Sequence, residues 1–171
     1  MTSSKQVTFK KLEIGDLDLL EKWNREPHVK KYWDSDKSWE ESYEKYILRT
    51  SSEVVKQFIA YDEETPFAYI QFYWASKVGD GWWEGIDEGT AGIDLYIGEP
   101  SYLGKGFGKT VLKSFVDFLF DNPEVNRIIA DPNPKNEKIQ KLLMSLGFSN
   151  IGPIKTPDGE ALLFELRRSR K

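Results

Sequence analysis

The chain has 171 residues, of which 39% are hydrophobic and 30% charged, a composition that predicts one soluble globular domain over residues 1–171. The net charge of −4 argues against a nucleic-acid-binding protein, which usually carries a basic face. The chain has no cysteine and a single histidine, His28, which excludes a thiol nucleophile, a disulfide framework and a multi-histidine metal site. The short polar start and the absence of a long apolar run predict a cytoplasmic protein without a signal peptide or membrane span.

Hydrophobic periodicity predicts both strands and helices in the first half of the chain. We expect a helix to open at Asp16, and another to run from residue 39 to about 48. Ser38 and Glu41 have the spacing of a capping box at the start of the second helix. Strands are predicted at residues 7–12, 54–61, 67–74 and 90–97. The second and third of these strands form an antiparallel hairpin, and a loop rich in glycine and acidic residues precedes the fourth.

The second half alternates helices with strands. A helix is predicted over residues 106–120, and a second one, capped by Asn136, runs to Leu146 and is closed by Gly147. Strands are expected at residues 127–130, 148–154 and 161–166. The strand–helix–strand order here implies a parallel pair, whereas the first half is antiparallel. The fold class is therefore α/β (α+β), with a mixed, mostly antiparallel sheet of about seven strands and helices on both faces.

A glycine-rich loop lies between the fourth predicted strand and the helix after it, with the sequence Leu-Gly-Lys-Gly-Phe-Gly-Lys over residues 103–109. Glycine lets a phosphate approach the backbone closely, and a helix N-terminus supplies N–H donors and a positive field. Glycines before a helix also serve simply as turns, so the motif alone leaves both readings open. It lacks the Gly-Lys-Ser/Thr of a P-loop, and its place after several antiparallel strands does not fit a Rossmann loop.

The strand, glycine loop, helix, short strand and Asn136-capped helix resemble motifs A and B of the GNAT acetyltransferases. Gly106 and Gly108 occupy the two small positions of that pattern, and Leu103 stands where the family has Gln or Arg. The resemblance implies the GNAT fold, acetyl-CoA as co-substrate and no metal. It places the pyrophosphate on the glycine loop and the pantetheine arm along the preceding strand. The implied cofactor-binding residues are Leu95, Tyr96, Ile97, Leu103, Gly104, Lys105, Gly106, Phe107, Gly108, Lys109 and Asn136.

An acidic and aromatic loop precedes the same strand, with Gly-Asp-Gly-Trp-Trp-Glu at residues 79–84 followed by Asp87, Glu88 and the strand residue Asp94. Carboxylates attract ammonium groups and flat rings cover apolar sugar faces, so this loop suits a polyamine or an aminosugar. The alternative is a solvated acidic loop with one tryptophan folded onto the core. Two adjacent tryptophans in a polar, glycine-flanked loop favour the binding function.

Several short motifs, in order along nearly the whole chain, resemble the aminoglycoside 6′-N-acetyltransferases. They include residues 79–84, Gly-Ile-Asp at 92–94, Asn-Pro-Glu-Val at 122–125, Asp-Pro at 131–132 and Thr-Pro-Asp-Gly at 156–159. The resemblance implies a small cationic amine as partner. Its implied substrate-binding residues are Trp33, Asp80, Trp82, Trp83, Asp94, Asp131 and Asp158. Trp33 could instead be a core residue, Asp131 and Asp158 ordinary turn residues, and His28 a surface residue at a helix end.

The expected reaction is direct attack of the free amine on the thioester, without a covalent enzyme intermediate. We expect Asp94 to position the amine and accept its proton, with Asp80 as second candidate, and a backbone N–H near Leu95 or Tyr96 to stabilise the oxyanion. The family often has a tyrosine that protonates the leaving thiolate, and Leu143 stands at that position. Tyr102 and Ser145 remain as possible donors.

Two other functions stay open. One is acetylation of another amine, such as a polyamine, a siderophore hydroxylysine or a protein N-terminus, because Leu95 stands where the resistance enzymes usually have Gln. The other is a CoA-binding module that has lost catalysis, which Leu143 would explain. No nucleic acid or membrane partner is expected, and the protein should be a monomer or homodimer.

Overall fold

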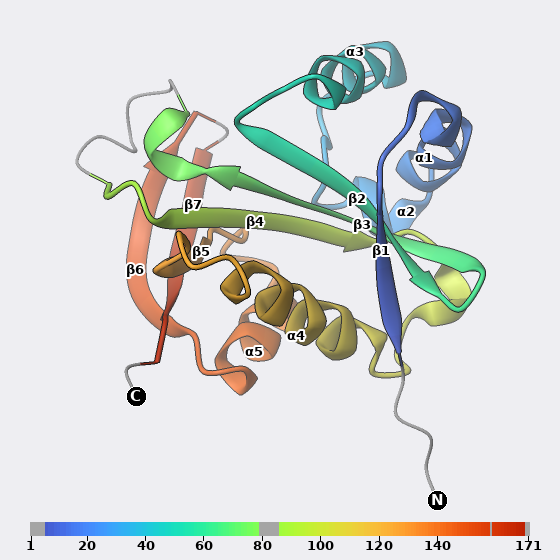
Figure 1. Ribbon diagram of the computed structural model, residues 1–171. Coiled ribbons are helices and arrows are strands. Elements are labelled where there is room, and N and C mark those ends of the chain that lie inside the picture. The colour runs from blue at the N-terminus through green and yellow to red at the C-terminus, as the bar shows by residue number, and fades with distance from the viewer. Residues whose placement is uncertain (1–5, 79–85, 158, 170–171) are drawn as a thin grey trace, which may run out of the picture. The chain divides into compact units, whose positions relative to one another are not determined.

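The computed structural model describes residues 6–78, 86–157 and 159–169, and its strands form a seven-stranded sheet in the order β1-β2-β3-β4-β5-β7-β6 (Figure 1). The strands are β1 (Val7–Lys11), β2 (Val55–Asp62), β3 (Thr65–Trp74), β4 (Thr90–Ile97), β5 (Arg127–Ala130), β6 (Ser149–Thr156) and β7 (Gly159–Arg167). β4 and β5 pair in parallel, whereas β1–β2, β5–β7 and β6–β7 are antiparallel. The predicted mixed, mostly antiparallel sheet is confirmed.

Within the part of the chain that the structure describes, five α-helices and three short 3-10 helices connect the strands. The α-helices are α1 (Leu17–Asn24), α2 (Pro27–Lys30), α3 (Trp39–Thr50), α4 (Phe107–Phe120) and α5 (Glu137–Ser145). The 3-10 helices are η1 (Ile14–Asp16), η2 (Ala75–Lys77) and η3 (Pro100–Tyr102). The sequence did not predict α2, which is a single turn with Pro27 at its first position. A single turn is too short for hydrophobic periodicity to detect.

The chain divides into two compact units, and each is described by itself. The first comprises Met1–Gln71 with Asp94–Val111, and the second comprises Phe72–Ile93 with Leu112–Lys171. Strands β3 and β4 and helix α4 each contribute residues to both units. The single domain expected for residues 1–171 stays a prediction.

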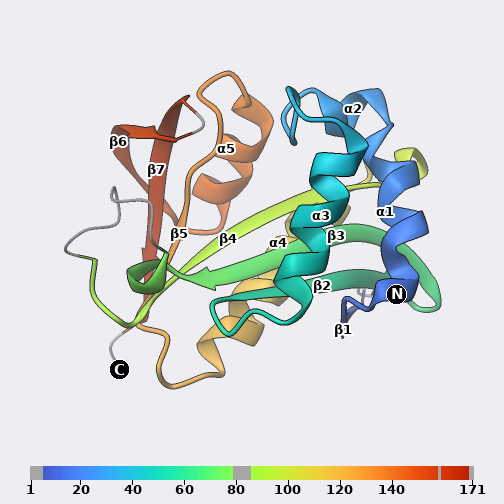
Figure 2. The same cartoon turned by 90° about the horizontal axis from the view of Figure 1, so that it is seen from above.

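Two hydrophobic clusters form on opposite faces of the strands of the first unit. One joins α1 and α3 to the sheet through Leu20, Trp23, Tyr46, Ile59 and Tyr69, all of them fully buried. The other contains Ala60 and Phe67 of the strands and Val111 of α4. Figure 2 shows α1 and α3 over the strands β2 and β3. The expected helices on both faces of the sheet are therefore present in this unit.

Two arginines organise the second unit. Arg127 on β5 forms hydrogen bonds with Thr90 on β4 and Glu165 on β7, at 3.0 and 3.2 Å. Arg168 donates to the carbonyls of Phe120 and Asn122, both at 2.8 Å, and so caps the C-terminal end of α4. The parallel register joins Thr90–Gly92 to Arg127–Ile129.

Candidate active site

The glycine loop takes the backbone conformation that its sequence predicts. Gly104 and Gly106 have φ angles of 72° and 81°, in the left-handed region that favours glycine. An added Cβ at Gly104 would meet no atom within 4 Å, so conformation rather than space requires glycine there. α4 begins directly after the loop, and the Thr110 N–H donates to the Gly106 carbonyl at 3.3 Å. Backbone N–H groups at a helix start suit a pyrophosphate, and the lysine side chains of residues 105 and 109 are exposed beside them.

Two aromatic rings fix the ends of the glycine loop. Tyr102 stacks on Phe67 with ring centroids 4.8 Å apart, and Phe107 contacts Phe67 edge-on at 5.2 Å. The Tyr102 hydroxyl donates to the Asp62 carboxylate at 3.0 Å, at the end of β2. The loop between these rings is therefore held against the sheet, as a preorganised phosphate site requires.

Strand β4 presents different residues to its two faces. The Tyr96 side chain belongs to the buried cluster formed with α1 and α3, whereas Leu95 and Ile97 pack with the cluster that includes Phe107. Because side chains alternate along a strand, Asp94 lies on the same face as Tyr96. The Tyr96 side chain is therefore part of the core. Only the backbone of Tyr96 would be able to contact the cofactor, as the sequence analysis predicted for this residue.

Asp94 is held by a side chain that the sequence analysis did not identify. Gln71 on β3 donates from Nε2 to Asp94 Oδ2 at 2.9 Å. Arg49 on α3 donates from Nη1 to Gln71 Oε1 at 3.0 Å, and the Tyr69 hydroxyl approaches the same oxygen at 2.6 Å. Asp94 is only partly buried, but Gln71 is buried. The signal that could have found Gln71 is a lone amide within the apolar run of β3.

Three tyrosines form a buried polar and aromatic cluster next to these contacts. The Tyr46 and Tyr96 hydroxyls lie 3.0 Å apart, and Asn24 Nδ2 lies 3.1 Å from each. Tyr69 stacks on Tyr96 with centroids 5.3 Å apart. Burial raises the pKa of Tyr46 to about 12, and it raises the pKa of Tyr69 and Tyr96 well above the ordinary value. All three are therefore neutral hydroxyls at physiological pH.

Trp33 joins this cluster. Its Nε1 donates to the Tyr46 hydroxyl at 3.0 Å, and its ring lies 4.9 Å from the Tyr96 ring. The side chain is only partly buried. Trp33 was expected to be either a core residue or a substrate-binding residue, and it has features of both. It packs on the core, and it stays partly exposed on the face that bears Asp94.

The structure describes some of the other predicted site residues and not the rest. Asp131 follows β5 in the second unit, where it is partly buried. Asn136 caps α5, as predicted, and accepts from the Ile139 N–H at 3.5 Å. Asp80, Trp82, Trp83 and Asp158 lie outside the described residues. His28 is in α2, where its Nε2 is 2.8 Å from the Ile97 carbonyl, so it is a structural residue.

The leucine at the family's tyrosine position and the two side chains considered as thiolate donors have distinct environments. Leu143 on α5 is buried and has no proton to give. The Ser145 hydroxyl donates to the Leu142 carbonyl at 2.7 Å. Burial, together with the hydrogen bond to Asp62, raises the pKa of Tyr102, which makes it a weaker acid. Neither Tyr102 nor Ser145 is therefore a ready proton donor.

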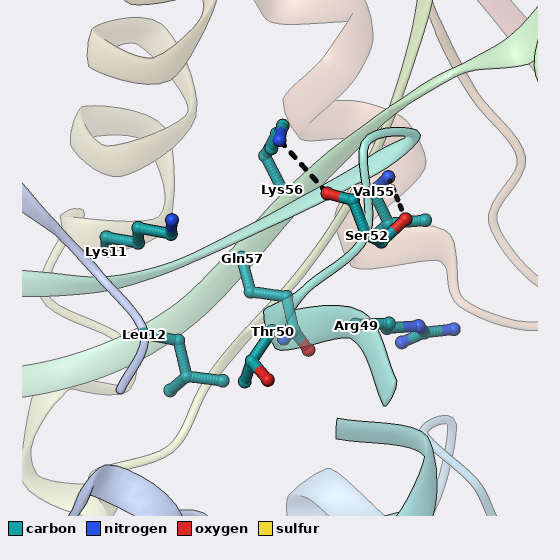
Figure 3. A pocket seen from close by; sticks show the side chains of 8 residues that line it. All are labelled: Lys11, Leu12, Arg49, Thr50, Ser52, Val55, Lys56 and Gln57. Carbon is teal, nitrogen blue, oxygen red and sulfur yellow. Dashed lines mark hydrogen bonds between the residues drawn. The ribbon is translucent and has the colours of Figure 1, made fainter. Parts of the chain in front are cut away.

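A hollow of about 210 Å³, part of it open to solvent, lies beside α3 and β2 (Figure 3). Its lining residues are Lys11, Leu12, Arg49, Thr50, Ser52, Val55, Lys56 and Gln57. Three of these are cationic and none is acidic, so the hollow repels a substrate that carries several ammonium groups. It is therefore not the acceptor site.

The chain matches a known protein family. A family model described as an acetyltransferase (GNAT) domain matches residues 14–156. The chain belongs to the GNAT acetyltransferases. The protein is an acetyl-CoA-dependent N-acetyltransferase, as the resemblance to the family implied. Among the described residues, no group of histidine, cysteine or carboxylate side chains could hold a metal ion. Similarly, no described helix is long and apolar enough to cross a membrane.

Within the family, this acetyltransferase is similar over nearly its whole length to several aminoglycoside acetyltransferases. It is 34% identical over 167 residues to aminoglycoside N(6′)-acetyltransferase type 1 of Klebsiella pneumoniae, covering 94% of this chain and 82% of that protein. It superposes with a TM-score of 0.87 and 33% identity on the crystal structure of aminoglycoside acetyltransferase AAC(6′)-Ib in complex with coenzyme A, over 95% of both chains. A structure of the same enzyme with coenzyme A and kanamycin gives a TM-score of 0.86, again at 33% identity and 95% coverage of both chains.

Proposed function

We propose that this acetyltransferase transfers the acetyl group of acetyl-CoA to the 6′-amine of an aminoglycoside antibiotic. The observation that carries the proposal is the similarity, over nearly the whole chain, to aminoglycoside N(6′)-acetyltransferases, one of them solved with kanamycin. The partly exposed carboxylate of Asp94 supports it, on the face of β4 where Trp33 packs against Tyr96, because an aminoglycoside carries several ammonium groups and its sugar rings have apolar faces. Asp80, Trp82, Trp83, Asp131 and Asp158 stay proposed substrate contacts.

In the proposed mechanism Asp94 performs the proton chemistry. Acetyl-CoA supplies an activated acetyl group when it is bound. The Asp94 carboxylate attracts the substrate ammonium, orients it and accepts its proton directly or through one water, so that the neutral nitrogen attacks the carbonyl carbon. The C–N bond forms first and gives an oxyanion. The nitrogen then loses its second proton to water, the C–S bond breaks, and the thiolate leaves and takes a proton from water, which its modest basicity permits. The β4 backbone near Leu95 and Tyr96 is the proposed donor to the developing oxyanion.

The substrate class is tested by thiol release. Purified enzyme with acetyl-CoA is offered kanamycin, spermidine, or a peptide with a free N-terminus. We expect release with kanamycin at least tenfold faster than with the other two amines. Because the chain has no cysteine, a thiol reagent detects only the released coenzyme. Release with spermidine or the peptide alone would overturn the aminoglycoside assignment, and no release with any amine would indicate a binding module.

The proton acceptor is tested with Asp94→Asn, which keeps the shape of the side chain and removes its charge. We expect kcat/KM for kanamycin to fall at least 100-fold, within the range that general-base catalysis contributes. The KM for acetyl-CoA should change less than twofold. Unchanged turnover would remove Asp94 from the proposed mechanism and leave Asp80 as the candidate base.

The protein is expected to work in the cytoplasm, where acetyl-CoA is available, as a monomer or homodimer. Light scattering coupled to size exclusion distinguishes the two assemblies.

A further inference from the structure

The strongest unexplained feature near the proposed site is a pair of buried amides inside the sheet. Gln57 and Gln71 are each 3% exposed, in strands that are otherwise hydrophobic at their inward-facing positions. A buried amide is costly unless it is hydrogen-bonded, so each needs an explanation. Gln57 donates to the Tyr46 carbonyl at 3.1 Å and accepts from the Tyr69 hydroxyl at 2.7 Å, which is a structural role. Gln71 instead donates to the carboxylate of Asp94.

The orientation of the Gln71 amide is set from its other end. A guanidinium has only donors, so Arg49 Nη1 at 3.0 Å requires the oxygen of the amide to face it. The NH₂ group must then face Asp94. The Tyr69 hydroxyl has a single proton for the oxygens of Gln57 and Gln71. Because Arg49 already serves the oxygen of Gln71, that proton is available to Gln57.

The charges around these contacts act in one direction. Burial raises the pKa of Tyr69, so its hydroxyl is neutral, and the same holds for Tyr46 and Tyr96 on α3 and β4. Arg49 on α3 is the cation of this chain of contacts. Its charge polarises the Gln71 amide and strengthens the NH₂ group as a donor. A donor to a carboxylate stabilises the ionised form, which is the form that binds an ammonium and accepts its proton.

We infer that Gln71 and Arg49 are positioning residues for Asp94: Gln71 fixes the Asp94 carboxylate and keeps it ionised, and Arg49 fixes the orientation of the Gln71 amide. The inference rests on the proposed role of Asp94. By this inference, the pH below which amine binding and acetylation are lost is set by the contact between Gln71 and Asp94 inside the sheet, and not by the acidic loop. Neither residue touches the reacting atoms, so both act through Asp94.

The experiment compares pH profiles of kcat/KM for kanamycin in four variants. Gln71→Met keeps the volume and removes the donor, and we expect its acid limb to move up by about one pH unit, a tenfold loss at the foot of the profile. Gln71→Glu places a second carboxylate against Asp94 and should move the limb further. Arg49→Met should move it in the same direction by less. Gln57→Met is the matched control, since it also removes a buried amide but does not contact Asp94, and its acid limb should stay in place.

A second readout does not depend on turnover. Calorimetric titration of kanamycin into enzyme without acetyl-CoA, over the same pH range, should show the same order of variants in affinity. The KM for acetyl-CoA should change less than twofold throughout. If the wild-type enzyme is active and the Gln71 variants have the same acid limb as the wild type, the inference is wrong but the proposed function stands. An equal shift in Gln57→Met would also overturn the inference, because it would mark a general packing effect.

Failure of the proposed function looks different from failure of the inference. A wild-type enzyme that binds kanamycin but acetylates only another amine removes the aminoglycoside assignment, and the pH profile is then measured with that amine. A wild-type enzyme that neither binds nor acetylates any amine overturns the proposed function and the inference together.

Discussion

At the residue scale, tight packing at the end of β4 fixes where the glycine loop begins. Gly98 lies against the ring of Trp23, which is fully buried and whose Nε1 donates to Glu99 at 2.9 Å. A Cβ on residue 98 would overlap the indole ring. Glycine is needed here for space, whereas at Gly104 it is needed for backbone conformation.

Gly98→Ala should therefore destabilise the protein. The buried indole cannot move aside cheaply, so we expect a loss of about 1–3 kcal/mol of unfolding free energy, as is usual for overpacking. Urea denaturation followed by tryptophan fluorescence measures it. Gly15→Ala is the control, because a Cβ there meets nothing within 4 Å. Equal stability of the two variants would show that the end of β4 is loosely packed.

Some residues of the candidate site could be predicted from the sequence, and others could not. Asp94 could be singled out because a carboxylate inside an apolar strand is conspicuous on its own. Gln71 could have been noticed as a lone amide in an apolar strand, but its contact with Arg49 could not be predicted, because it joins residues 22 apart in the sequence that only the fold brings together. The placement of Trp33 was likewise left open, since the choice between core and surface depends on how α2 and α3 pack.

At the scale of elements, the sequence predicted a helix end correctly where capping side chains mark it. The capping box predicted for Ser38 and Glu41 is present, with the Glu41 N–H donating to Ser38 Oγ at 3.2 Å. β4 and β5 have the predicted bounds. Differences occur at strand ends without such signals: β2 and β3 extend further into their turn, where Glu63 takes a φ of 54°.

The cap of α3 gives a prediction, because this helix carries both Tyr46 and Arg49. Ser38→Ala removes the side-chain acceptor and should cost about 1 kcal/mol of unfolding free energy, measured by urea denaturation. Ser51→Ala at the other end of the helix is the matched control, and we expect it to stay within about 0.5 kcal/mol of wild type. An equal loss in both variants would mean that the capping box contributes nothing specific.

At the scale of the whole molecule, the buried tyrosines make stability depend on alkaline pH. In the unfolded chain Tyr46, Tyr69 and Tyr96 ionise near pH 10, whereas in the folded protein burial raises the pKa of Tyr46 to about 12 and raises the pKa of Tyr69 and Tyr96 well above the ordinary value. Above pH 10 the unfolded chain therefore binds fewer protons, and the free energy of unfolding falls as pH rises. Lys45 opposes this slightly, because burial lowers its pKa and stability rises with pH below its unfolded value.

We expect unfolding free energy to be nearly flat from pH 8 to about 9.5 and then to fall by up to about 4 kcal/mol per pH unit, since each group contributes about 1.4. Urea denaturation at successive pH values measures the slope. Tyrosinate absorbance should show the buried cluster ionising only as the fold is lost. Tyr46→Phe should reduce the slope by about one third. A single tyrosine transition near pH 10 in folded protein would contradict the prediction.

The alternation of side chains along β4 has an evolutionary consequence. Asp94 and Tyr96 lie on one face and Leu95 and Ile97 on the other, so substitutions can alter the face that bears Asp94 while the face that packs with the glycine loop stays intact. An insertion or deletion of one residue within β4 would exchange the two sets. Related enzymes should therefore change the amines they accept by substitution, with the length of this strand held constant.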